Sequence, residues 1–177
     1  MKIQIIGASG TGKSTLAKFI SEQENIKWID TDYYLWKDNS FTVNNPIELR
    51  RSMYEEDIET NSSYIVSGSV FSWCPEGFVD RDLLVFLSLD ERDRLERLRT
   101  REIKRNGSNA MWLDENGLYT NDFLEWCKTY WTEEDQSIGG TFAEQLYQME
   151  LSKSTFIKLD SSQPVEQLYK EIMNKMQ

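Results

Sequence analysis

A glycine-rich segment near the amino terminus constrains this chain more than any other feature. Residues 7–14 read Gly-Ala-Ser-Gly-Thr-Gly-Lys-Ser, and they follow a short apolar run at 3–6. Glycines let the backbone curl so that successive N–H groups point at phosphate oxygens, and the following helix adds its positive end. A segment of this kind, placed between a buried strand and an amphipathic helix, predicts a phosphate-binding loop.

The residues of this segment have separate expected roles. Lys13 is expected to contact the β- and γ-phosphates of ATP, and the Ser14 hydroxyl is expected to bind Mg²⁺. Thr15 would reach the side of the α-phosphate. The expected nucleotide-binding residues are Gly7, Ser9, Gly10, Thr11, Gly12, Lys13, Ser14 and Thr15. The alternative, a glycine-rich turn without a ligand, fits the flanking strand and helix less well.

Short apolar runs alternate with helical patterns along the chain. Strands are predicted at 3–6, 26–29, 64–66, 83–89 and 156–159. Helices are predicted at 13–24, 46–60, 90–105, 119–133 and 140–151, with a last one opened by Pro164. This alternation predicts one α/β domain over residues 1–177, a three-layer arrangement whose parallel sheet has right-handed crossovers and helices on both faces. Residues 106–118, rich in Asn and Gly, are predicted to form an exposed loop.

Two carboxylates follow the second predicted strand. The carboxyl end of this strand should lie beside the phosphate loop, and Asp30 and Asp32 occupy that end. In an extended segment, side chains at i and i+2 point the same way. One carboxylate can then support Mg²⁺ while the other accepts a proton from a substrate hydroxyl. The alternative is that both residues only cap a turn or a helix.

Basic residues are concentrated between positions 92 and 105. Seven of the 20 Lys and Arg residues lie there, namely Arg92, Arg94, Arg97, Arg99, Arg101, Lys104 and Arg105. Arg97, Arg101 and Arg105 recur every four residues and share a helix face. Fixed positive charge stabilises a migrating phosphoryl group, so we expect at least one of these three to contact phosphate. The alternative is a solvated basic face paired with acids elsewhere.

These features, in this order, resemble the group of P-loop kinases that contains nucleoside monophosphate kinases and shikimate kinase. The likeness spans nearly the whole chain and is closest to a bacterial branch described as adenylate-kinase-like or as ATPases. Besides the phosphate loop, it rests on Asp30-Thr31-Asp32 with the aromatics after it, Ser67-Gly68-Ser69 with Trp73 nearby, the run 97–102, and Trp126 with Tyr130.

The resemblance implies a sheet order of 2-3-1-4-5, a short mobile lid at about 106–118, and transfer of the γ-phosphoryl group of MgATP. The acceptor would be a hydroxyl or phosphate of a small nucleoside-like, nucleotide-like or shikimate-like metabolite. In the shikimate kinase pattern two aspartates divide metal support and substrate contact, which assigns the metal to Asp30 and the acceptor to Asp32. The chain departs from both enzymes, because its third strand ends in Ser67-Gly68-Ser69 without an acid or a Gly-Gly-Gly turn.

Aromatic residues follow the second and third predicted strands, on the expected acceptor side. They can enclose a planar acceptor, or they can pack as core. The residues predicted to bind the acceptor are Asp32, Tyr33, Tyr34, Trp36, Gly68, Ser69 and Trp73.

Composition narrows the remaining possibilities. The chain has no histidine, which excludes Ser-His-Asp catalysis and imidazole zinc sites, and its net charge of −10 disfavours nucleic acid as a partner. No stretch suits a signal peptide or a membrane span, and Cys74 and Cys127 are expected to be free thiols, so the expected location is the cytoplasm. A monomer or a homodimer is expected. Two functions stay open: an ATP-dependent small-molecule kinase, or a regulatory ATPase that acts as a nucleotide-driven switch.

Overall fold

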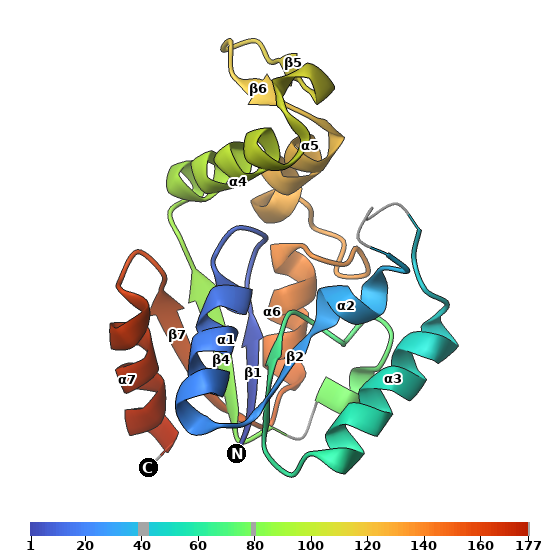
Figure 1. Cartoon of the computed structure of the whole chain (residues 1–177), viewed down its shortest axis with the longest axis vertical. Helices are drawn as coiled ribbons and strands as arrows, with labels where there is room; N and C mark the ends of the chain where they lie inside the picture. The colour runs from blue at the N-terminus through green and yellow to red at the C-terminus, as the bar shows by residue number, and fades with distance from the viewer. Residues whose placement is uncertain (39–42, 79–80, 177) are drawn as a thin grey trace.

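The computed structural model describes residues 1–38, 43–78 and 81–176. Its centre is a five-stranded parallel sheet of order β2-β3-β1-β4-β7 (Figure 1). The strands are β1 (Lys2–Ile6), β2 (Lys27–Asp30), β3 (Tyr64–Ser67), β4 (Leu83–Ser88) and β7 (Thr155–Asp160). The helices around the sheet are α1 (Lys13–Glu24), α2 (Thr31–Leu35), α3 (Ile47–Thr60), α6 (Phe142–Leu151) and α7 (Val165–Met176), while α4 (Glu91–Asn106) lies beyond the carboxyl edge of the sheet (Figure 1).

The two faces of the sheet build two separate apolar cores. Ile3 and Ile5 of β1 pack with the buried residues of α1 and α7 on one face. On the other face, Ile6 and Phe86 pack with residues of α2, α3 and α6. Burial on both faces explains why β1, β3 and β4 are nearly continuous apolar runs, as parallel strands between helix layers must be.

The predicted fold is confirmed. The two strands between β4 and β7 in the chain belong to a separate small sheet, so β7 is the fifth strand of the main sheet, and the observed order matches the predicted 2-3-1-4-5. All neighbouring strands in it run parallel, with Ile5 opposite both Ser67 and Val85. Their carboxyl ends therefore meet at one edge, and the phosphate loop leaves β1 at that edge. That the chain is a single domain over 1–177 stays a prediction.

Three local predictions need correction. The segment after β2, predicted as extended, is the short helix α2, because Asp30 caps it and Tyr34 packs inward. The predicted loop at 106–118 contains a 3-10 turn, η2 (Ser108–Ala110), and continues into a small hairpin of β5 (Trp112–Leu113) and β6 (Tyr119–Thr120). The predicted helix at 119–133 is the shorter α5 (Asp122–Lys128), followed by η3 (Thr129–Trp131).

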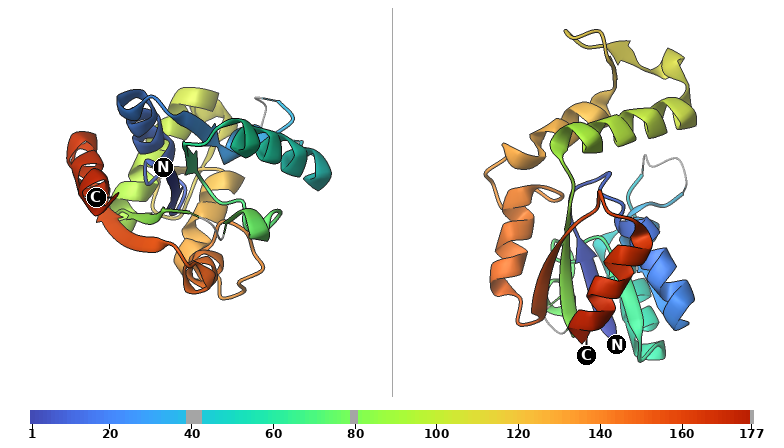
Figure 2. Two further views of the ribbon diagram at one scale, coloured as in Figure 1. Left: turned by 90° about the horizontal axis from the view of Figure 1, so that it is seen from below. Right: turned by 90° about the vertical axis from the view of Figure 1, so that its left-hand side faces the viewer.

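The segment 91–131 stands over the carboxyl edge of the sheet. Figure 1 and the right view of Figure 2 show α4 and α5 crossing above the phosphate loop, with the β5–β6 hairpin at the far end of the molecule. We call the whole segment 91–131 the lid, which is longer than the lid predicted at about 106–118, and its α4 and α5 the lid base. Among the described residues, no helix combines the length and the apolar character that crossing a membrane requires.

Candidate active site

The phosphate loop joins β1 to α1 and depends on glycine at three positions. Gly7, Gly10 and Gly12 have φ angles of +146°, +87° and +91°, a region that side chains rarely allow. A Cβ atom at Gly7 would lie 2.2 Å from the carbonyl oxygen of Leu87, and one at Gly10 would lie 2.7 Å from Leu98 Cγ. The loop is therefore packed tightly between β4 and the lid helix α4.

The amino terminus of α1 is open to an anion. Its N-cap residue is Gly12, no side chain caps it, and its first turn carries no acidic residue. A Cβ atom at Gly12 would meet nothing within 4 Å. By contrast, the amino termini of α2, α4, α5 and α6 are each capped by a side chain. An uncapped helix end behind a glycine loop suits a phosphate group, so the described residues fit a bound nucleotide.

Lys13 lies within the loop that it is predicted to serve. Its ammonium group donates to the carbonyl oxygens of Gly7 and Ala8, at 2.8 and 2.9 Å. The pKa of Lys13 is lowered to about 8, mainly by burial and also by the positive charges of Arg101 and Arg94, while the charges of Asp32 and Asp30 oppose the shift. The ammonium is therefore a poorly solvated cation, which gains most from a phosphate anion.

Ser14 and Asp30 come together beside Lys13. Burial raises the pKa of Asp30, as does the negative charge of Asp32, while hydrogen bonding from Ser14 and the charge of Lys13 oppose the rise. A hydroxyl next to a carboxylate at the phosphate loop is a donor set that suits Mg²⁺, which takes few protein ligands and completes its shell with phosphate and water. No group of three or more His, Cys, Asp or Glu side chains that could hold a metal occurs among residues 1–38, 43–78 and 81–176.

The two aspartates differ in their surroundings. Asp30 Oδ1 accepts from the backbone N–H of Asp32 at 3.2 Å and caps α2, while a metal role for Asp30 stays a prediction. Asp32 is exposed in the first turn of α2, where its charge still acts on both Lys13 and Asp30. The prediction that Asp30 and Asp32 lie in one extended segment is wrong, because Asp32 belongs to α2. Both carboxylates nevertheless lie close enough to act on Lys13.

The three predicted phosphate arginines separate along α4. Arg101 is the one whose charge acts on Lys13, and its guanidinium also lies over the ring of Phe123 at 5.6 Å. Arg97 donates to the carbonyl oxygen of Ser161 at 3.4 Å, in the turn after β7. Arg105 lies 3.9 Å from Glu102 near the end of the helix. Arg101 is therefore the member of the set whose charge acts on Lys13, and contact of any of the three with a phosphate stays a prediction.

A fourth arginine, Arg94, contacts the phosphate loop directly. It is buried at 1% exposure and donates to the carbonyl oxygen of Ser9 at 2.9 Å. Sequence reasoning counted Arg94 among the basic residues without assigning it to the site. Its position on the buried stripe of α4, three residues after Glu91 and four before Leu98, is the signal that marks it, because an arginine there needs a built-in partner.

The predicted aromatic acceptor wall is only partly present. Tyr34 and Trp73 are 2% and 6% exposed, and both pack edge-on against Tyr54, which fits the alternative that these aromatics pack as core; their contact with an acceptor stays a prediction. The hydroxyl of Tyr34 donates to Asp57, which explains its inward orientation. Tyr33 is 72% exposed and Trp36 is partly buried, and these two stay candidates for contact with an acceptor.

The turn after β3 has clear packing roles. Gly68 has a φ of +104°, and a Cβ atom there would lie 1.9 Å from Thr31 Oγ1, so glycine lets α2 pack against the end of β3. The Ser69 hydroxyl donates to Gln148 Oε1 at 2.9 Å and accepts from the backbone N–H of Phe71. Contact of Gly68 and Ser69 with a substrate stays a prediction.

Comparison with known proteins places the chain among P-loop proteins. A family model described as an AAA domain matches residues 3–116. The uncharacterized protein YqaC of Bacillus subtilis is 39% identical over 128 residues, which is 72% of this chain and 71% of that protein. The shikimate kinase of Staphylococcus aureus is 32% identical over 57 residues, only 32% of this chain and 33% of that enzyme.

The fold also matches solved kinases. A deoxyadenosine kinase from M. mycoides superposes with a TM-score of 0.58 over 99% of this chain and 98% of the other, at 18% identity. Identity at this level shows a shared fold. The chain therefore shares the fold of a solved small-molecule kinase.

Proposed function

The chain belongs to the AAA domain family of P-loop proteins, and from this premise we propose that it is an ATP-dependent phosphotransferase acting on a small molecule. One observation carries the proposal. The open end of α1, the partly buried Lys13 ammonium and the Ser14–Asp30 pair lie close together, beside the exposed Asp32. Such a site supplies what phosphoryl transfer needs, which is fixed charge, a place for Mg²⁺ and a carboxylate within reach.

Each residue has a proposed role. The backbone N–H groups of residues 7–15 hold the phosphates, Lys13 neutralises the β- and γ-phosphates, and Ser14 with Asp30 holds Mg²⁺. MgATP supplies the phosphoryl group when it is bound. Arg101 stabilises negative charge from the lid side, because its own charge already acts on Lys13. Asp32 orients the acceptor and takes its proton, since it is exposed and not used as a helix cap.

The acceptor proposed is a small metabolite with a hydroxyl or a phosphate group. Two similar proteins support this class by their names, since shikimate and deoxyadenosine are small hydroxyl compounds. Tyr33 is the exposed aromatic next to Asp32 and would contact a planar acceptor. ATP and Mg²⁺ are the proposed nucleotide and metal, and a cytoplasmic monomer or homodimer is the proposed form.

A regulatory ATPase is the second candidate. The same phosphate site would then hydrolyse ATP, and the lid would change its contacts with a partner. The exposed apolar residues of the β5–β6 hairpin favour this candidate, because Trp112, Leu113 and Tyr119 are 47%, 58% and 39% exposed. Such residues offer a surface to a partner, although a kinase lid can also use them to cover a substrate.

Mass spectrometry separates the two candidates. The protein is incubated with MgATP and pooled nucleosides, nucleotides, shikimate-like acids and sugars, and the products are analysed. A phosphorylated acceptor supports the kinase and identifies its substrate class. ADP and phosphate formed at a rate that no pool component changes would contradict the kinase and favour the ATPase. Lys13→Ala is the control, and it should abolish turnover in either case.

A further inference from the structure

Arg94 is a buried cation in the lid base, and all its donor groups face the protein. Its side chain is 2% exposed. Nε and Nη2 donate to the two carboxylate oxygens of Glu91 at 2.8 and 2.6 Å, in a bidentate pair. Nη1 donates to the carbonyl oxygen of Ser9 at 2.9 Å, and Nη2 also donates to that of Cys127 at 2.8 Å. A single guanidinium thus joins α4, the end of α5 and the phosphate loop.

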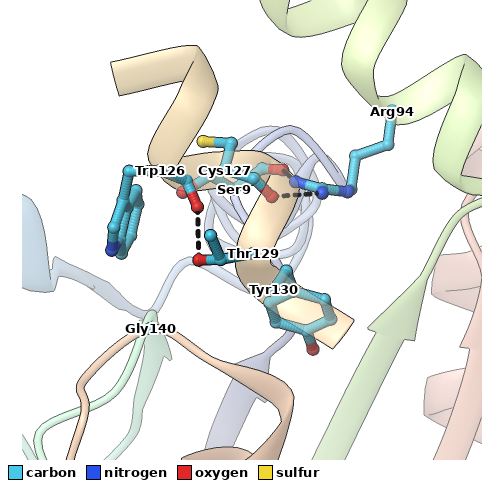
Figure 3. A pocket seen from close by; sticks show the side chains of 7 residues that line it. All are labelled: Ser9, Arg94, Trp126, Cys127, Thr129, Tyr130 and Gly140. Atoms are coloured by element: carbon cyan, nitrogen blue, oxygen red, sulfur yellow. Dashed lines mark hydrogen bonds between the residues drawn. The ribbon is translucent and has the colours of Figure 1, made fainter. Parts of the chain in front are cut away.

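The groups around Arg94 hold it in this orientation. Figure 3 shows its guanidinium reaching Ser9 and Cys127 in the pocket that Tyr130 and Trp126 also line. Its Cζ lies 5.4 Å from the centre of the Tyr130 ring, a favourable position for a cation over an aromatic face. Glu91 is fixed in turn, because Trp131 Nε1 donates to its Oε2 at 3.1 Å.

The contact with Ser9 bears on the direction of the loop amides. A peptide unit is planar, so its C=O and the following N–H point in opposite directions. Because Arg94 holds the Ser9 carbonyl toward α4, the N–H of Gly10 is directed away from α4. Gly10 is also packed there, since a Cβ atom would lie 3.2 Å from the carbonyl oxygen of Arg94 itself.

A second link, from α6, holds another carbonyl of the loop. Gln145 Nε2 of α6 donates to the Gly7 carbonyl oxygen at 3.2 Å, and its Oε1 accepts from the Tyr130 hydroxyl at 2.7 Å. Tyr130 is the residue whose ring lies under Arg94. The lid base and the loop are therefore connected at Ser9 directly and at Gly7 through Tyr130 and Gln145.

We propose that Arg94 is a positioning residue for nucleotide binding, which acts by fixing the Ser9–Gly10 peptide so that the loop is ordered before ATP arrives. This inference rests on the proposed function in one respect, that the ligand of the loop is ATP. It concerns the binding of ATP and not the transfer of its phosphoryl group. A loop ordered in advance loses less conformational freedom when it binds, and the affinity is higher for that reason.

The first test compares ATP affinity in two substitutions of Arg94, measured by isothermal titration calorimetry. Arg94→Met removes every donor and should weaken ATP binding about tenfold or more, because the loop must then be ordered when ATP binds. Arg94→Lys keeps the charge, but one ammonium cannot make the forked contacts, so it should recover only a small part of the affinity. Arg92→Met, at an exposed position of the same helix, is the matched control and should change affinity less than about twofold.

The second test reads the loop without nucleotide. Hydrogen exchange of the amides in residues 7–12 should be faster in Arg94→Lys than in the wild type, while exchange in β1 and the centre of α1 stays unchanged. Should Arg94→Met fail to fold, Glu91→Gln replaces it, because this variant keeps Arg94 and loses only the carboxylate that orients it. It should also speed exchange in the loop.

Two results would overturn the proposal. Full recovery of ATP affinity in Arg94→Lys would mean that positive charge alone matters. Unchanged loop exchange and unchanged affinity in folded Arg94→Lys and Glu91→Gln would mean that Arg94 only packs the lid base. Neither result depends on phosphoryl transfer, so a failure of the kinase proposal leaves this test valid.

Discussion

Lys13 illustrates at the scale of one residue how burial prepares a side chain for its ligand. The lysine stays near the loop carbonyls and has a pKa of about 8, well below its ordinary value of 10.5. Burial disfavours the charged form, whereas a bound phosphate favours it. Binding of ATP should therefore raise the pKa of Lys13, and the protein should take up a proton when it binds ATP at alkaline pH.

The first prediction is a loss of ATP affinity above about pH 8. Below this pH Lys13 is already protonated, so its contribution to binding is complete. Above it, protonation must accompany binding, and affinity should fall by up to about tenfold per pH unit. Titration calorimetry between pH 7 and pH 10, in buffers of different ionisation enthalpy, measures both the affinity and the proton uptake. Constant affinity up to pH 10 without proton uptake would contradict the prediction.

The second prediction separates the two aspartates. Asp32→Asn should lower the rate of transfer by about a hundredfold or more, the usual contribution of a general base, while ATP affinity changes little. Asp30→Asn should instead raise the Mg²⁺ concentration needed for half-maximal ATP binding. Each variant is the control of the other. Equal loss of ATP binding and transfer in Asp32→Asn would assign Asp32 to the metal.

Some residues of the candidate site could be predicted from the sequence, and others could not. The phosphate loop itself could be predicted, because its glycines and Lys13 act through local backbone geometry, whereas the roles of its residues stay predictions. The inward turn of Tyr34 could not, since it depends on Asp57 and on packing against Tyr54, which are distant in sequence. Arg94 was missed for a similar reason, because its partners Ser9 and Cys127 meet only in the folded chain.

At the scale of secondary-structure elements, α4 and the phosphate loop form one packed unit. Leu98 is 1% exposed, and a Cβ atom at Gly10 would lie 2.7 Å from its Cγ. Gly10 also has a φ of +87°. The close approach of helix and loop therefore depends on a glycine facing a leucine.

The third prediction is a coupling between these two residues. Gly10→Ala should destabilise the protein by about 1–2 kcal/mol from backbone strain, with more from the clash. Leu98→Ala should cost about 2–5 kcal/mol through loss of buried surface. The double variant should be more stable than the sum of the two effects by at least about 0.5 kcal/mol, because the clash is absent. Urea unfolding of the four proteins measures this coupling, and additive effects would contradict the contact.

Helices and strands could be predicted from the sequence where their apolar residues recur at a regular spacing. The five strands of the main sheet and the helices α1, α3, α4, α6 and α7 follow from apolar spacing and end signals, with small shifts at their ends. The helix α2 has five residues, too few to show a period, and it forms because Asp30 caps it and Tyr34 is drawn into the core. The β5–β6 hairpin has strands of two residues and is fixed by Asp114, which accepts from the backbone N–H groups of Asn116 and Leu118.

For the whole molecule, the distribution of charge matters more than its sum of −10. The densest group of basic residues lies on α4, yet several of its members are already engaged. Arg94 pairs with Glu91 and Arg99 with Glu96, at 2.6 Å in both cases. Arg101 and Arg105 lie near Glu102. From these ion pairs we expect α4 to offer little to a long polyanion.

The fourth prediction is that nucleic acid does not bind. Fluorescence anisotropy of labelled single-stranded and double-stranded DNA and RNA should show no saturable binding at micromolar protein, even in low salt. A net negative surface repels a chain of phosphates over distances comparable to the Debye length, about 30 Å at 0.01 M salt. Binding that weakens steeply as salt is added would contradict the prediction and reveal a basic surface.

The contact between Trp131 and Glu91 has a practical consequence. Indole emission responds to the charges and hydrogen bonds around the ring, and this indole shares its carboxylate partner with Arg94. The protein therefore carries its own optical probe at the joint between the lid base and the phosphate loop. With the other tryptophans replaced by phenylalanine, stopped-flow recording of Trp131 emission could time the arrival of a ligand without any added dye.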